Sequence, residues 1–183
     1  MQIWDKYAEF IYKTATGDKR RRNLITAVAP LVFYAITALV IFVAYLVDKR
    51  LAFPFFGFSF SWWRIVISVF LIALGCVIAG WTYAAFARTR GTPIPFSPPP
   101  KLITTSLYAH VRNPMAIAGI LIGEGLGFLL GSLSLILIFI PLLTLLGFLY
   151  LKAVEEREFE LRFGKEYLEY KKRVPMFIPK FRR

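Results

Sequence analysis

Two polar segments far apart in the sequence carry side chains that could together bind a small charged molecule. The first, residues 104–113, ends with Arg112 and Asn113, and Pro114 follows. Asparagine is a good helix N-cap and proline fits the first helical turn, so we predict that a helix begins at Pro114. A helix N-terminus beside Arg112 favours an anionic group such as a carboxylate. The plainer alternative is a capped membrane helix with an arginine that anchors in lipid headgroups.

The second polar segment follows a long apolar block and contains Lys152 and the pair Glu155 and Glu156. The block is long enough for two antiparallel helices, so Glu155 is expected at the same membrane face as Asn113. We therefore predict that Arg112, Asn113 and Glu155 converge on one pocket. A cation, a helix N-terminus and a carboxylate could hold a zwitterionic amino acid group and the hydroxyl pair of a ribose.

The composition places both segments in a membrane protein. Hydrophobic residues make up 57% of the 183 residues, only 19% are charged, and the mean hydropathy is +0.59. A soluble domain has about a quarter of its residues charged, so an ordinary soluble globule and a disordered chain are both excluded. The chain has one cysteine, Cys76, and one histidine, His110. Metal sites built from these residues and disulfide frameworks are therefore not expected, and the net charge of +12 points to lipid headgroups rather than nucleic acid.

Long apolar runs define the membrane spans. Two runs contain no charged residue, and a third, residues 114–151, contains one, Glu124. A span needs about 20 residues, so the third run is long enough for two helices and is predicted to break at Gly131 and Ser132. We expect an all-α, polytopic membrane fold in one domain, residues 1–183. Its four transmembrane helices are expected at residues 24–47, 65–87, 114–131 and 132–151, the last two as a tight hairpin.

The distribution of lysine and arginine predicts the orientation. These residues are concentrated in residues 1–23, 88–113 and 152–183, whereas the loop between the first two spans carries few. By the positive-inside rule the three basic segments, and with them both termini, are expected on the cytoplasmic side. The segment 1–23 is predicted to form a short amphipathic helix on the membrane surface, with a mobile tail as the alternative. This helix would use residues recurring at helical spacing: Ile3, Trp4, Tyr7, Phe10 and Ile11.

Three further segments carry expectations of their own. The aromatic loop 50–63 is expected to form an interfacial belt, with a lid over a lipid entry as the alternative. Five prolines should make residues 94–100 extended and stiff. The alternating charges after Glu156 predict an exposed, salt-bridged helix. This last expectation covers Glu158, Glu160 and Arg162.

Glu124 lies beside a strip of glycines inside the third predicted span. The strip lets another helix approach closely, either the following span or the span 65–87. It consists of Gly119, Gly123, Gly127 and Gly131. A carboxylate at this depth costs about 2.5–3.5 kcal/mol on insertion scales, so Glu124 is expected to face the bundle interior or a cavity. It could be an acid or base that faces a substrate, or it could make a structural hydrogen bond to a residue such as Trp81, Thr82 or Tyr83.

The segment 101–179 resembles a known family. Three of its parts carry the resemblance: Leu-Ile-Thr-Thr-Ser-Leu-Tyr-Ala-His-Val-Arg-Asn-Pro-Met at 102–115, Glu155-Glu156, and Phe163-Gly164 through Val174-Pro175 to Pro179. They are similar in order and spacing to the integral-membrane isoprenylcysteine carboxyl methyltransferase family, which is related to phospholipid N-methyltransferases. The resemblance implies an S-adenosylmethionine site in the cytoplasmic region formed by residues 88–113 and 152–183. With Arg112 added from the argument above, the expected cofactor-binding residues are Lys101, Leu102, Ile103, Tyr108, Arg112, Asn113, Pro114, Met115, Ala116 and Glu155.

The resemblance implies methyl transfer to a membrane-embedded lipid or lipidated acceptor, such as a prenylcysteine carboxylate. The sequence departs from the family pattern at Asn113, which replaces a histidine, at Ala116, which replaces a tyrosine, and at Leu151, where an arginine would face a substrate carboxylate. A phospholipid amine is the alternative acceptor, and a non-enzymatic membrane scaffold or carrier is the alternative function. Three residues are candidates for catalysis: Glu124 and Glu156 as bases for an amine, and Lys152 to orient an anionic acceptor. No metal and no nucleic acid partner are expected.

Overall fold

The computed structural model describes residues 2–51, 62–89, 91–92, 94 and 99–179, and all regular structure in these residues is helical. The prediction of an all-α fold is confirmed. Most of the aromatic loop 50–63 and of the proline-rich segment 94–100 lies outside the described residues, so neither expectation is tested.

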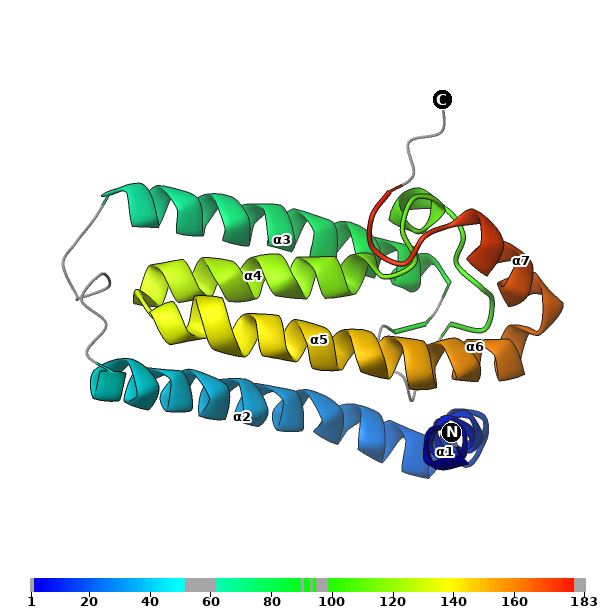
Figure 1. Cartoon of the computed structure of the whole chain (residues 1–183). Coiled ribbons are helices and arrows are strands. Elements are labelled where there is room, and N and C mark those ends of the chain that lie inside the picture. Colours follow the sequence, from blue (N-terminus) through cyan, green and yellow to red (C-terminus); the bar gives the residue numbers. More distant parts are fainter. Residues whose placement is uncertain (1, 52–61, 90, 93, 95–98, 180–183) are drawn as a thin grey trace.

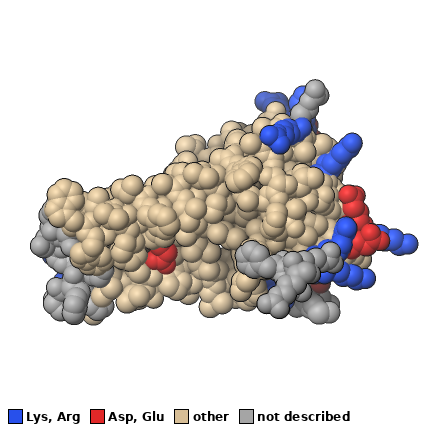
Figure 2. Space-filling view, turned by 90° about the horizontal axis from the view of Figure 1, so that it is seen from above, with Lys and Arg blue, Asp and Glu red and all other residues tan. Residues whose placement is uncertain are grey.

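The long helices lie side by side (Figure 1), and most of the charged residues on the face shown in Figure 2 lie at one end of the bundle. Three helical stretches are long and apolar enough to cross a membrane: α2 (Lys19–Leu51), α3 (Trp62–Arg88) and the stretch Leu135–Phe163. The third predicted span, 114–131, corresponds to α4 (Pro114–Leu130), which is apolar but has 17 residues. α2 begins at Lys19, earlier than predicted, because the basic cluster continues the helix rather than preceding it.

The predicted hairpin turns at Gly131 and Ser132. Gly131 has a φ of 66°, a left-handed conformation that glycine adopts without strain, and it ends α4. Asp48, near the end of α2, accepts a hydrogen bond from the Ser132 hydroxyl and one of 2.8 Å from the backbone N–H of Ser134. A carboxylate thus caps the start of the returning helix.

The returning helix continues without a break past the predicted end of the span at Leu151. It consists of η3 (Leu135–Phe139), α5 (Ile140–Tyr150), η4 (Leu151–Glu155) and α6 (Glu156–Phe163), in which η3 and η4 are π-helical turns. Gly164, at a φ of 54°, separates it from α7 (Lys165–Arg173). A continuous helix therefore carries Glu155 and Glu156 directly from the apolar region to the charged end.

The closest helix packing in the bundle is between α3 and α4. A Cβ on Gly75 of α3 would lie 3.0 Å from the Ala118 carbonyl oxygen, and one on Gly125 of α4 would lie 3.1 Å from the Ser68 carbonyl oxygen. Two glycines of the predicted strip face the next helix, Gly123 at Ile140 and Gly127 at Ile136, whereas Gly119 has no atom within 4 Å of an added Cβ. Glycines thus admit neighbours on both sides of α4.

The helix α1 (Gln2–Thr16) was expected and is present, and it packs on α6 and η4. This contact overturns the prediction of an exposed salt-bridged helix for Glu158, Glu160 and Arg162. Glu158 is only 3% exposed and pairs with Arg162, whose guanidinium lies over the ring of Tyr12 of α1. The alternating charges indicated ion pairs correctly but gave no sign that another helix would cover them.

We expect Gly125→Leu to lower the stability of the bundle, because the new side chain would meet the α3 backbone at Ile72 and Ser68. Overpacking of this kind costs about 1–3 kcal/mol. The matched control is Gly80→Leu on α3, where no atom lies within 4 Å of the added Cβ. Thermal unfolding in detergent measures both variants. Equal unfolding midpoints for the two would show that α3 and α4 are not packed this closely.

Candidate functional site

A cavity of about 210 Å³ lies at the charged end of the bundle, beside the start of α4. It is formed by the end of α3, the segment before α4, η4, α6 and α7, which the sequence separates widely. Its described walls are largely apolar and aromatic with a few charged groups. The lining residues are Phe86, Pro99, Leu102, Ile103, Tyr108, Arg112, Asn113, Met115, Ala116, Leu151, Glu155, Glu156, Phe159, Phe163, Tyr167 and Tyr170.

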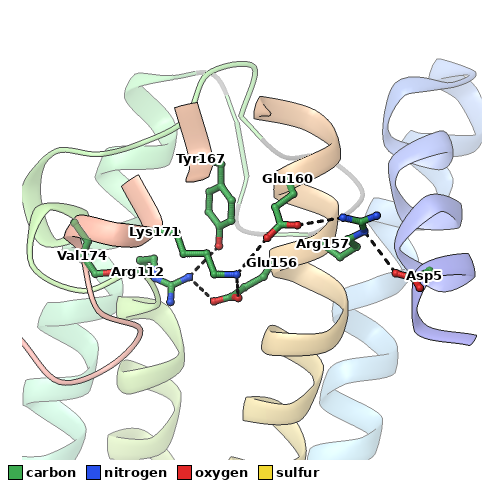
Figure 3. Close-up of polar contacts among 8 residues, drawn as sticks. All are labelled: Asp5, Arg112, Glu156, Arg157, Glu160, Tyr167, Lys171 and Val174. Atoms are coloured by element: carbon green, nitrogen blue, oxygen red, sulfur yellow. Dashed lines mark hydrogen bonds and ion pairs between the residues drawn. The ribbon is translucent and has the colours of Figure 1, made fainter. Parts of the chain in front are cut away.

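Arg112 is fixed in the wall of this cavity by partners from three parts of the chain (Figure 3). Its Nη1 donates to Glu156 Oε1 and, at 3.1 Å, to the Tyr167 hydroxyl, and its Nε donates to the Val174 carbonyl at 3.0 Å. The Arg112 and Glu156 side chains are 11% and 10% exposed. Burial is the largest single effect and would lower the pKa of Arg112, but the hydrogen bonds and charges of Glu156 and Tyr167 together outweigh it and raise the pKa. The guanidinium therefore stays charged.

The ion pair continues outward through Lys171 and Arg157. Lys171 contacts Glu156 at 2.5 Å and Glu160 at 3.2 Å, and Arg157 joins Glu160 at 3.2 Å. Desolvation lowers the pKa of Lys171, whereas the hydrogen bonds with Glu156 and Glu160 raise it, and the net direction is upward. Glu156 is thus held between two cations, Arg112 and Lys171.

The C-terminal segment fastens the loop before α4 through backbone bonds. The N–H groups of Arg112 and Asn113 donate to the carbonyls of Pro175 and Met176, at 2.9 and 3.2 Å. Asn113 occupies the predicted N-cap position, but its side chain makes no capping hydrogen bond, and the structure has Pro114 in the first turn. The side-chain amide of Asn113 can therefore bind a ligand in the cavity that this residue lines.

Tyrosines close the cavity opposite α4. The Tyr170 hydroxyl donates to the Tyr108 carbonyl at 2.6 Å, and Tyr167 binds Arg112. Burial raises the pKa of the Tyr108 phenol, and the nearby Glu155 raises it further. Burial likewise raises the pKa of Tyr170. These phenols stay neutral and can donate hydrogen bonds.

The structure brings most of the predicted cofactor-binding residues to this one cavity. Two lie outside its lining: Lys101 is exposed, and Pro114 is buried in the first turn of α4. The predicted residues that do line the cavity are Leu102, Ile103, Tyr108, Arg112, Asn113, Met115, Ala116 and Glu155. Among the proposed catalytic residues, Glu156 lines the cavity, and Glu124 and Lys152 do not.

Sequence reasoning missed an aromatic wall of the cavity. Phe159, Phe163, Tyr167 and Tyr170 line it from α6 and α7. Their spacing by three or four residues is a helical signal that could have indicated a shared face. Phe86, at the end of α3, also lines the cavity, and no sequence pattern marks it.

A second, larger cavity of about 550 Å³ lies among the apolar helices α2, α4 and α5. Its described lining contains no charged residue. Three lining positions are glycines, and a Cβ added to Gly119 or Gly147 would have no atom within 4 Å. Only Ala116 and Leu151 line both cavities, within the described part of the chain. These two side chains are therefore the boundary between the charged cavity and the apolar one.

Glu124 and Lys152 lie apart from both cavities. Glu124 is partly exposed and lines neither of them. The expectation that it faces the bundle interior or a cavity stays a prediction, and Thr82, one of the partners considered for it, donates to the carbonyl of Ile78. Lys152 is exposed and lies 5.9 Å from the ring centroid of Phe148, which lines the apolar cavity.

The family model described as phospholipid methyltransferase matches residues 63–166, more than half of the chain. The chain belongs to the phospholipid methyltransferase family. Comparisons with curated proteins and with solved structures gave no match. Membership in this family supports a membrane methyltransferase. The matched segment contains Arg112, Glu155 and Glu156 and ends just before Tyr167, whereas α1 and α2 lie outside it.

We expect Glu156→Gln to destabilise this phospholipid methyltransferase family protein by about 3 kcal/mol, because Arg112 would keep its buried charge without a carboxylate. The control is Glu166→Gln, which removes the same charge from an exposed position on α7. Thermal unfolding in detergent compares the two. A Glu156→Gln midpoint equal to that of the control would mean that the Arg112 pair does not hold the charged end together.

Proposed function

We propose that the protein is an S-adenosylmethionine-dependent methyltransferase that acts on a membrane-embedded lipid or lipidated acceptor. The observation that carries the proposal is the pair of cavities, one charged and one apolar, with Ala116 and Leu151 as their common boundary. When bound, S-adenosylmethionine supplies a methyl group on a positively charged sulfur. The family match supports methyl transfer at a membrane, and the cofactor and the acceptor are part of this proposal.

The donor groups of the charged cavity fit this cofactor. Arg112 and the N-terminus of α4 suit its carboxylate, and the Glu155 carboxylate suits the amino group or the ribose hydroxyls. The aromatic residues of α6 and α7 offer faces on which a base can stack. When ionised, Glu155 also places negative charge near the cavity, which favours a cationic sulfur over its neutral form. Burial raises the pKa of this carboxyl to about 7.

The apolar cavity fits a lipid chain. Phe33 and Tyr34 of α2 line it and are well exposed, so it is reachable from the side that faces lipid. α2 contacts the rest of the bundle at α1 and at η3, near its two ends, which leaves room between α2 and the helices α4 and α5. A tail lying there would bring its polar head to Ala116 and Leu151, where small and apolar side chains leave the shortest path.

The residues near that boundary bear on the acceptor. An amine must lose a proton before it can be methylated, but Glu156 is held between Arg112 and Lys171, and Glu124 lines neither cavity. A carboxylate needs no base, and Lys152 beside Phe148 provides a cation near the apolar cavity. We therefore propose a lipidated carboxylate, such as a prenylcysteine, as the first acceptor to test. A phospholipid amine is the second acceptor to test, because the matching family model is described as phospholipid methyltransferase.

The cofactor part of the proposal is tested by calorimetry with S-adenosylhomocysteine on the purified protein. We expect wild-type binding, and we expect Glu155→Gln to weaken it at least about tenfold, the loss of one charge-assisted hydrogen bond. Glu166→Gln on the exposed face of α7 is the matched control and should bind like wild type. An unchanged affinity in Glu155→Gln would remove Glu155 from the site, and no binding by wild-type protein would contradict the proposed function.

The acceptor part is tested by labelled methyl transfer to a prenylcysteine and to a phospholipid extract, followed by mass spectrometry. We expect Gly119→Leu to abolish transfer without changing S-adenosylhomocysteine affinity, because its side chain would fill the apolar cavity without a clash. Gly80→Leu, also free of steric contact but outside the cavity, should transfer normally. Full activity of Gly119→Leu would show that the acceptor does not use this cavity, and the labelled product decides between carboxylate and amine.

A further inference from the structure

The helix α1 lies across the charged end of the bundle rather than along it. Figure 1 shows it along its own axis, while α2 to α5 run across the same view. One side of α1 is buried: Ala8, Ile11 and Ala15 are at most 6% exposed, and Ala8 and Ile11 form a cluster with Val154. Val154 is the residue immediately before Glu155, so α1 packs directly behind the wall of the charged cavity.

A neighbouring side of α1 is apolar and uncovered. Ile3, Tyr7 and Phe10 follow each other at helical spacing and are 79%, 45% and 44% exposed. Asp5, Glu9 and Lys13 lie on the other side of the helix by the 100° advance per residue, and the exposed Lys6 lies between them and Phe10. An uncovered apolar stripe of this kind, on a helix perpendicular to membrane spans, is the arrangement of a helix lying in a lipid interface.

Positive charge flanks the same stripe. Lys19, Arg20 and Arg21 are exposed at the start of α2, and the Arg21 guanidinium lies 6.0 Å from the ring centroid of Phe10. Arg22 instead turns back to the Ala15 carbonyl of α1, at 3.3 Å, and helps to fix the corner. Apolar side chains beside three exposed cations suit an anionic lipid, whose acyl chains would contact the apolar stripe and whose phosphate would contact the cations.

Two connections join α1 to the charged cavity. The first is the buried apolar packing of Ala8 and Ile11 on Val154 of η4. The second is the row of ion pairs in Figure 3, from Asp5 of α1 through Arg157, Glu160 and Lys171 to Glu156, which pairs with Arg112. Its outermost pair, Asp5 and Arg157, is about half exposed and contributes little free energy. The apolar packing on Val154 therefore contributes most of the coupling between α1 and the cavity.

We propose that α1 and the start of α2 form a binding surface for anionic lipid headgroups, and that lipid bound there holds η4 and α6 in the arrangement that binds the cofactor. The surface consists of Ile3, Tyr7, Phe10, Lys19, Arg20 and Arg21. The second half of this inference rests on the proposed function, because it concerns the cofactor cavity, and the first half does not. Anionic lipid thereby raises the affinity of the cavity for its ligand by reciprocal coupling.

The experiment uses the full chain in nanodiscs of phosphatidylcholine with or without phosphatidylglycerol. The variant replaces Lys19, Arg20 and Arg21 by Gln, and leaves Arg22 in place. A matched control replaces Lys165, Lys172 and Arg173 of α7 by Gln, which removes the same charge from exposed positions elsewhere at this end. Unfolding midpoints show that each variant is folded.

Lipid contact is read from Trp4, which is half exposed on α1, as the fluorescence difference between wild type and Trp4→Phe. We expect brominated lipids to quench it, and brominated phosphatidylglycerol to quench it more than brominated phosphatidylcholine. The Lys19, Arg20 and Arg21 variant should lose this preference, and the α7 control should keep it. Absence of quenching, or a preference that the variant retains, would overturn the lipid surface. A particle with two copies and unquenched Trp4 would assign the stripe to a second protomer.

Coupling is read from S-adenosylhomocysteine affinity by calorimetry in the same nanodiscs. We expect phosphatidylglycerol to tighten binding at least about fivefold in wild type and in the α7 control, but not in the Lys19, Arg20 and Arg21 variant. Equal affinity in both lipids, with Trp4 still quenched, would overturn the coupling alone. No binding in any lipid would contradict the proposed function, while the Trp4 result would still decide the lipid surface.

Discussion

The buried pair of Arg112 and Glu156 is the contact on which the charged end of the molecule depends. It joins the loop before α4 to the helix that returns from the hairpin, and Tyr167 and Val174 add the C-terminal segment to the same guanidinium. A buried cation with one carboxylate partner is costly unless its other donors are also used, and here Nε and Nη1 both have acceptors. The cavity lies between these three segments, and their contacts with Arg112 fix the segments relative to one another.

Glycine and small side chains shape the rest of the molecule in two opposite ways. At Gly75 and Gly125 the neighbouring helix occupies the space that a side chain would take, so α3 and α4 form a close pair. At Gly119 and Gly147 nothing fills the space, and an apolar cavity remains. In lipid there is no water to drive helices together, so α2 can stand away from α4 and α5 without the penalty that a soluble protein would incur.

The fold was largely predictable because apolar length is a strong signal, whereas contacts between helices were not. The spans, the break at Gly131 and the N-terminal helix follow from charge-free runs and helical spacing. The convergence of Asn113 and Glu155 followed from the hairpin alone. Burial of Glu158 under α1 and the position of Phe86 depend on tertiary contacts that leave no periodic pattern. The partial exposure of Glu124 was not predictable either, because insertion cost argues against exposure without excluding it.

Ala116 and Leu151 make the boundary between the two cavities uncharged. A charged side chain at this place would have to be desolvated on its apolar side, and it would draw water toward the apolar cavity. Alanine and leucine avoid both effects, and they leave the charges of Arg112 and Glu155 on one side of the boundary. In the proposed function, any orientation of the acceptor headgroup then comes from groups at the rim of this boundary. Lys152, exposed beside Phe148, is the cation that the described structure offers there.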